Sequence, residues 1–153
     1  MTKRDFSLIG ITALIMCIPL IIIARKNNEQ AFLPSTAYDW KDMKVTPLQI
    51  GERRHVFDSP TQTLDRLELH ITTLNPGDSS HAPHQHPNEE LLIVKDGTVW
   101  ALVNGQNVLL GPGSVVYQAA NRLHMFKNAG KTKTTYYALQ WRTPKTGKAE
   151  TGK

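Results

Sequence analysis

Two histidines and one glutamate lie close together in the middle of the chain, within the stretch 83–90. His84 and His86 are two residues apart, so on an extended strand their side chains point to the same face. Glu90 follows a Pro-Asn pair that readily turns the chain into a neighbouring strand. Neutral imidazoles and a carboxylate are the usual protein ligands of zinc, manganese, iron, nickel or copper. The stretch therefore predicts part of a metal site.

Other residues extend or compete with this group. His124 is a fourth candidate ligand, because it lies where a turn leads into a predicted strand. His81 and Glu89 are neighbouring alternatives, although exposure in a loop or at a rim is the simpler interpretation of each. His70 falls on the charged face of its predicted strand, where we expect it to be solvated. The catalytic residues stay unknown at this level, since no nucleophile or general base stands out.

Short strands have to position these side chains. Residues 66–74 alternate well, with Leu67, Leu69 and Ile71 on one face and charged or polar residues on the other. Gly105 with the following glutamine separates two strand-like segments and predicts a hairpin. The expected strands are 66–74, 90–94, 98–104, 107–110, 114–118, 124–127 and 134–142. This pattern, without a helical period, predicts an all-β antiparallel sandwich or barrel over residues 46–143.

Length and charge limit the function classes. A chain of 153 residues with 40% hydrophobic residues suffices for one packed domain. The net charge of +5 comes mostly from the flanks, because residues 45–143 carry 9 basic and 8 acidic groups. We therefore expect no nucleic-acid partner. The single cysteine, Cys17, excludes an intrachain disulfide.

The N-terminal part predicts a membrane segment. Residues 6–24 are uncharged, lie between basic pairs, and as a helix would reach about 28 Å, close to the hydrocarbon thickness. We expect a transmembrane signal-anchor helix after a short flank, 1–5, with the domain exported to a periplasmic or extracellular space. Cleavage as a signal sequence, giving a secreted protein, is the alternative, and acylation of Cys17 is disfavoured by the bulky Met16 before it. Residues 25–45 are expected to be a linker and 144–153 a disordered tail.

These residues resemble two motifs of the cupin superfamily, whose fold is a double-stranded β-helix, or jelly-roll barrel. The first motif, G-x5-H-x-H-x3,4-E-x6-G, is matched from His84 to Gly97, with one additional residue after Gly77. The second, G-x5-P-x-G-x2-H-x3-N, is matched in spacing by Gly113, Ala119, Asn121, His124 and Asn128. Ala119 replaces the usual proline. Asn121 replaces the glycine, and asparagine tolerates the positive φ that the turn requires.

The resemblance implies that His84, His86, Glu90 and His124 hold a divalent metal ion, with two coordination positions left open. Manganese, iron and zinc are the expected metals, and nickel and copper are possible. The function implied is that of a metal-dependent enzyme acting on a small organic substrate, whether oxygenase, isomerase or hydrolase. The alternative is a non-catalytic ligand-binding or sensory cupin, and a structural role at the membrane is a third reading. A homodimer is plausible by resemblance only.

Overall fold

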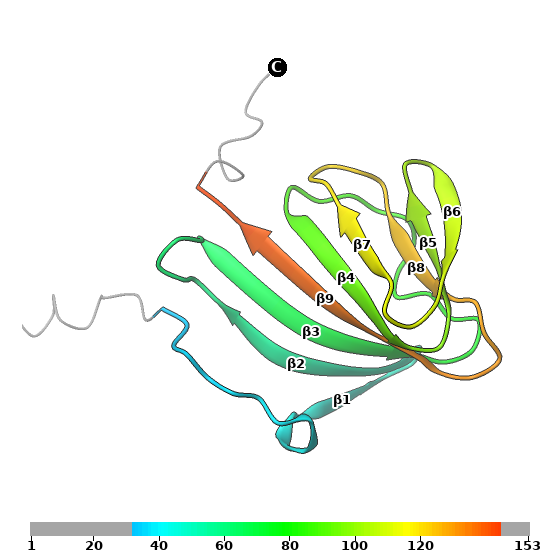
Figure 1. Ribbon diagram of the computed structural model, residues 1–153, viewed down its shortest axis with the longest axis horizontal. Helices are drawn as coiled ribbons and strands as arrows, with labels where there is room; N and C mark the ends of the chain where they lie inside the picture. Colours follow the sequence, from blue (N-terminus) through cyan, green and yellow to red (C-terminus); the bar gives the residue numbers. More distant parts are fainter. Residues whose placement is uncertain (1–31, 145–153) are drawn as a thin grey trace, which may run out of the picture. The chain divides into compact units, whose positions relative to one another are not determined.

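Two antiparallel β-sheets pack against each other in the computed structural model, which describes residues 32–144 (Figure 1). The larger sheet contains, in spatial order, β1 (Val45–Leu48), β2 (Gly51–Ser59), β3 (Arg66–Leu74), β9 (Thr134–Arg142), β4 (Glu89–Asp96) and β7 (Val115–Gln118). The smaller sheet contains β6 (Gln106–Leu110), β5 (Val99–Val103) and β8 (Met125–Asn128). A single turn of 3-10 helix, η1 (Trp40–Asp42), precedes β1.

The core lies between the two sheets. It draws from β3, β4, β7 and β9 on one side and from β5 and β8 on the other. Its buried members are Leu74, Leu92, Val94, Val99, Ala101, Val116, Phe126, Tyr136 and Ala138. The sequence expectation of an all-β fold is therefore confirmed, and every expected strand has a counterpart within one or two residues at its ends.

The expectation that His70 is solvated was wrong. His70 is only 6% exposed, and Thr72 on the same face is buried as well. On the other face Ile71 is 1% exposed, whereas Leu67 and Leu69 are half-buried. Alternation shows that a strand has two different faces, but it does not show which one is inside when the interior contains a polar cavity.

The hairpin between β5 and β6 turns one residue earlier than expected. Asn104 and Gly105 occupy its two central positions, with φ angles of 50° and 79°. Positive φ at both positions is typical of a type I′ turn, whose twist matches that of the flanking strands. The predicted positive φ of Asn121 is confirmed, at 58°.

Two further residues secure the connections around the core. Gly97 has a φ of +77°, and a Cβ atom there would lie 2.8 Å from Thr134. Asn128 is buried, and its amide nitrogen donates to the carbonyl oxygens of Leu74 (3.1 Å) and Thr132 (2.8 Å). The asparagine of the second motif thus ties β8 to the end of β3.

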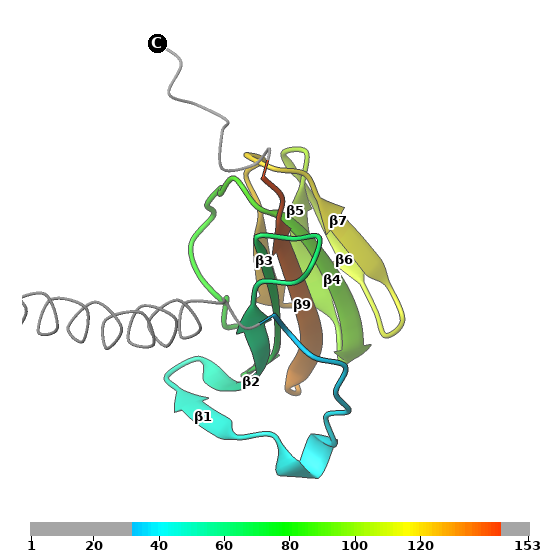
Figure 2. The same cartoon turned by 90° about the vertical axis from the view of Figure 1, so that its left-hand side faces the viewer.

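The expected membrane helix, residues 6–24, lies outside the described residues. Within residues 32–144, no helix has the length and hydropathy needed to cross a membrane. Residues 32–44, part of the expected linker, lie along β2: the Leu33 amide donates to the Pro60 carbonyl oxygen (2.9 Å), and the Tyr38 ring packs against Phe57. Figure 2 shows η1 and β1 at one end of the larger sheet.

Candidate metal centre

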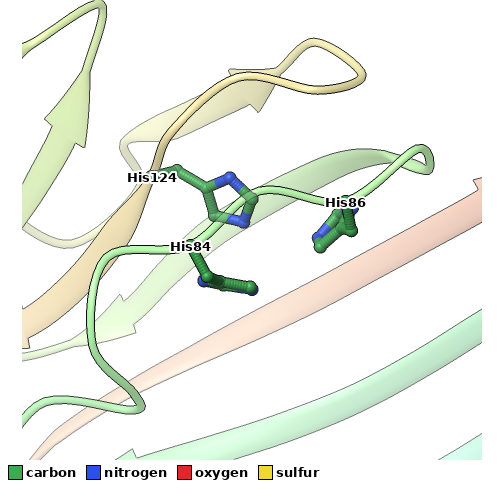
Figure 3. Close-up of side chains that lie close together, drawn as sticks. All are labelled: His84, His86 and His124. Carbon is green, nitrogen blue, oxygen red and sulfur yellow. The ribbon is translucent and has the colours of Figure 1, made fainter.

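Three histidines from two distant segments meet at one place (Figure 3). His84 and His86 lie in the loop between β3 and β4, and His124 directly precedes β8. His84 and His124 form an isolated antiparallel bridge, in which each backbone amide donates to the other's carbonyl oxygen at 3.1 and 2.9 Å. Their ring centroids are 4.4 Å apart, and the His86 ring lies 4.8 Å from that of His124. The pair 84/86 was expected on a strand, whereas backbone pairing in a loop positions it.

The ring nitrogens are arranged as metal ligands usually are. One nitrogen from each of the three histidines lies within 4.8 Å of the other two. His86 Nδ1 lies 2.9 Å from the Asn88 carbonyl oxygen, and His124 Nδ1 lies 2.7 Å from that of Arg122. A carbonyl can only accept, so each Nδ1 carries the proton and each Nε2 is left as the free electron-pair donor.

The free nitrogens are buried and unsatisfied. His84 Nδ1, His86 Nε2 and His124 Nε2 make no hydrogen bond to any residue between 32 and 144. Buried polar atoms nearly always have a hydrogen-bond partner, so three adjacent unpaired nitrogens indicate a site for a bound ligand. Two imidazole nitrogens on one tetrahedral zinc ion lie about 3.4 Å apart, whereas the nitrogens here lie up to 4.8 Å apart. A divalent transition-metal ion fits this cluster if the side chains move inward by up to about 1.4 Å.

Glu90 lies beside two of these histidines at the start of β4. It is 6% exposed, and its Oε2 lies 3.2 Å from His124 Nε2 and 3.8 Å from His86 Nε2. Its Oε1 accepts a hydrogen bond from Gln140 Nε2 at 3.0 Å. The 3.2 Å contact with His124 is an ion-pair approach rather than an aligned hydrogen bond. The carboxylate is thus next to the cluster, and its role as fourth ligand stays a prediction.

The protonation states differ among these residues. Burial would raise the pKa of Glu90, but contacts with His124, His86 and Gln140 outweigh it, so this pKa is lowered. The Glu90 carboxylate raises the pKa of His124 despite burial. Burial, reinforced by repulsion from His124 and His86, lowers the pKa of His84 and keeps its imidazole neutral.

The two alternative ligands are placed differently. Glu89 points to the opposite face of β4, where its carboxylate accepts hydrogen bonds from Tyr117 Oη and Trp141 Nε1, both at 2.7 Å. It is therefore not beside the histidines. His81 packs edge-on against His84 at 3.8 Å between ring centroids, but it is exposed and is not part of the cluster of ring nitrogens. Burial, followed by repulsion from His84, lowers the pKa of His81.

His84 and Glu90 line a cavity of about 200 Å³ between the sheets. Its apolar wall includes Leu92, Phe126, Tyr136 and Ala138, and its polar wall includes Arg53, His70, Thr72 and Gln140. Sequence reasoning missed this polar wall. Residue types alone gave no signal for it, because it forms through strand pairing: Glu68, Gln140 and Glu90 are consecutive partners across β3, β9 and β4, and so share one face.

Comparisons with known proteins agree with this geometry. The Cupin_2 family model, described as a cupin domain, matches residues 70–139. A search of curated proteins gave no match.

Solved structures resemble the chain in fold. An RmlC-like cupin from Shewanella frigidimarina is 12% identical with a TM-score of 0.60, covering 72% of this chain and 94% of its own. The polyketide cyclase RemF from Streptomyces resistomycificus is 19% identical (TM-score 0.59; 72% and 82% covered). The cupin domain of Cnp3 from Schizosaccharomyces pombe is 14% identical (TM-score 0.59; 74% and 78% covered). These structures show that the chain shares their fold, and the cupin domain model matches its residues 70–139.

Proposed function

We propose that the protein is a metal-dependent cupin enzyme that acts on a small organic substrate. The observation that carries the proposal is the set of buried, unpaired ring nitrogens of His84, His86 and His124, next to a cavity that His84 lines. Glu90 would complete the ligand set. A bound divalent ion would supply Lewis-acid or redox chemistry to a substrate that enters the cavity.

The chain's own residues prepare this site. Gln140 donates to Glu90 Oε1 and so orients the carboxylate, leaving Oε2 toward the histidines. Leu92 and Phe126, both almost fully buried, keep that part of the cavity apolar. His81 at the cavity wall has a lowered pKa, which keeps its ring neutral near neutral pH.

Elemental analysis combined with a metabolite screen tests the proposal. The full chain, purified in detergent if it partitions into membranes, should hold about one divalent ion, and the double variant His84→Ala/His124→Ala should hold none. Product formation that disappears with the metal is the expected result. A protein that holds metal and binds compounds without converting them would instead be a ligand-binding or sensory cupin. A protein without metal would contradict the proposed metal-dependent enzyme.

We also propose, from the sequence alone, that residues 6–24 anchor the chain and that the cupin domain is exported. The support is the long uncharged segment between basic pairs. Recovery of the protein in the membrane fraction after an alkaline wash is the expected result. Release into the soluble fraction with a shortened N-terminus would indicate signal cleavage.

Pairing of two chains through the larger sheet is a further proposal. Its support is a group of exposed apolar side chains on the outer face of β4 and β7, namely Ile93, Val115 and Tyr117. Sedimentation should show a dimer that Val115→Lys weakens.

A further inference from the structure

The cavity has a second polar wall across the sheet from the histidine cluster. Arg53 on β2 and Thr72 on β3 are partners in register, so their side chains share the inner face of the sheet. His70 lies two residues before Thr72 on that same face and is almost fully buried. All three line the cavity that His84 and Glu90 also line. A molecule in the cavity is therefore bounded by the histidine cluster and by Arg53.

A chain of hydrogen bonds orients Arg53. Its Nη2 lies 2.7 Å from His70 Nε2, and His70 Nδ1 lies 3.0 Å from Glu68 Oε1. A guanidinium can only donate, so Nε2 of His70 accepts and Nδ1 carries the proton that Glu68 accepts. His70 is thereby a neutral imidazole in one tautomer. The buried Glu68–His70 pair fixes the direction of the guanidinium.

Glu68 is itself held ionised. The hydrogen bond with His70 lowers its pKa and outweighs the effect of burial. Arg66 contributes from the other side, with Nη2 3.3 Å from Glu68 Oε2. The Glu68 carboxylate, which orients His70, is thus neutralised by Arg66 and does not need Arg53 as a counter-ion.

The charge of Arg53 is left without a partner. Its neighbour Arg54 pairs with Glu52 at 3.2 Å, and Arg66 pairs with Asp58 at 2.7 Å. Among the residues that the structure describes, by contrast, no carboxylate lies within 4.0 Å of the Arg53 guanidinium. Most of its N–H donors remain for a ligand, and a guanidinium binds a carboxylate through two parallel hydrogen bonds.

We propose that the cavity binds a small organic acid, with its carboxylate on Arg53 and a second oxygen donor directed at the histidine cluster. Arg53 determines the specificity for an acid, and His70 and Glu68 are positioning residues. The volume of about 200 Å³ limits the ligand to a few carbons, since sites for drug-sized molecules start at roughly 300 Å³. The contact of the second oxygen donor with the histidine cluster rests on the proposed function, whereas the contact of the carboxylate with Arg53 does not.

Matched acids and amides test the proposal on the full-length, Mn²⁺-loaded protein. Calorimetry would compare glycolate and malonate with glycolamide and malonamide, with inorganic phosphate as the other oxyanion. We expect the acids to bind and the amides to bind at least about tenfold more weakly. Only an acid has a carboxylate that can form charged, paired hydrogen bonds with the Arg53 guanidinium. Equal binding of acid and amide, or stronger binding of phosphate, would overturn the assignment.

Variants locate the acid. Arg53→Gln should weaken malonate binding at least about tenfold with unchanged metal content, and Arg53→Lys should restore part of it. Arg54→Gln is the matched control, because Arg54 pairs with Ile71 on the other face of the sheet, and it should bind malonate as the wild type does. Equal effects of Arg53→Gln and Arg54→Gln would contradict the proposal.

A double-mutant cycle tests the positioning role. His70→Ala should weaken malonate binding, and adding it to Arg53→Gln should cause no further loss, because His70 acts through Arg53. Additive losses would refute that role. If His70→Ala lowers the melting temperature strongly, Glu68→Gln replaces it in the same cycle. Metal content measured on every sample separates the two proposals: a metal-free protein with Arg53-dependent acid binding would refute only the proposed function.

Discussion

His84 and His124 hold each other through their backbones, with each amide donating to the other's carbonyl oxygen. Partners in such a bridge direct their side chains to the same side, which brings the two rings to 4.4 Å between centroids. The contact joins the loop before β4 to the segment before β8. The backbone pairing thus positions the two imidazole rings beside each other.

Glu90 and Glu89 provide a matched pair for testing the fourth ligand. Glu90→Gln keeps the size and the contact with Gln140 but removes the charge beside the histidines, so we expect metal affinity to fall at least about tenfold. Glu89→Gln changes a carboxylate on the opposite face and should leave the affinity unchanged. Competition with a chromophoric chelator measures both. Similar affinities for the two variants would remove Glu90 from the ligand set.

Metal binding should release a proton near neutral pH. The pKa of His124 is raised in the metal-free protein, mainly by Glu90, so its ring is protonated at pH values where an ordinary histidine is neutral. A bound metal requires the neutral ring. Up to about one proton per ion should be released below the raised pKa, and the number should fall as the pH rises through it. Calorimetry in buffers of different ionisation enthalpy measures this number. A pH-independent number would contradict the assignment, and His124→Gln should remove the effect.

Acid should destabilise the protein partly through Glu68. Its folded pKa lies below the unfolded value of about 4.5, so the stability it contributes is complete above that pH and is lost as the pH falls through the folded value. Urea unfolding at several pH values should show wild type more stable than Glu68→Gln by about 1 kcal/mol above pH 5. The difference should shrink below pH 4.5. Parallel curves for the two proteins would exclude this role.

Two glycines with nearly equal φ should tolerate alanine differently. Gly97 and Gly105 have φ angles of +77° and +79°, but only at Gly97 would a Cβ meet other atoms, at 2.8 Å from Thr134. Gly105→Ala should cost about 1 kcal/mol for the left-handed backbone alone. Gly97→Ala should cost about 3 kcal/mol because the overlap adds to that term. Chemical denaturation of both variants provides the comparison, and equal losses would show that the contact relaxes freely.

The sequence was informative where local chemistry decides the structure. Turn residues and alternation located the strands, and the motif spacing singled out His84, His86 and His124, which the structure brings together. Spacing also favoured Glu90 over Glu89, and the structure places only Glu90 on the side of the histidines. Neighbours along a strand face opposite ways, so one residue of difference selects the face.

The pairing of strands that are far apart in the chain could not be predicted from the sequence. The cavity wall depends on Arg53, Thr72 and Tyr136 being partners across β2, β3 and β9, and β9 is distant in sequence from the other two strands. His70 was assigned to solvent because its neighbours on the strand are charged, yet one of them, Glu68, is its hydrogen-bond partner, and the other partner is Arg53 on β2. A buried polar network is indistinguishable from a solvated face when only the residue types are known.

The position of β9 has a consequence for how the chain folds. β9 is the last strand in sequence, yet it lies between β3 and β4 and pairs with both along most of their lengths. During synthesis β3 and β4 are made early and must wait with unpaired edges until residue 142 has emerged. Closure of the larger sheet is therefore a late, long-range event. It makes this domain a slow folder that depends on protection of two open edges before its last strand arrives.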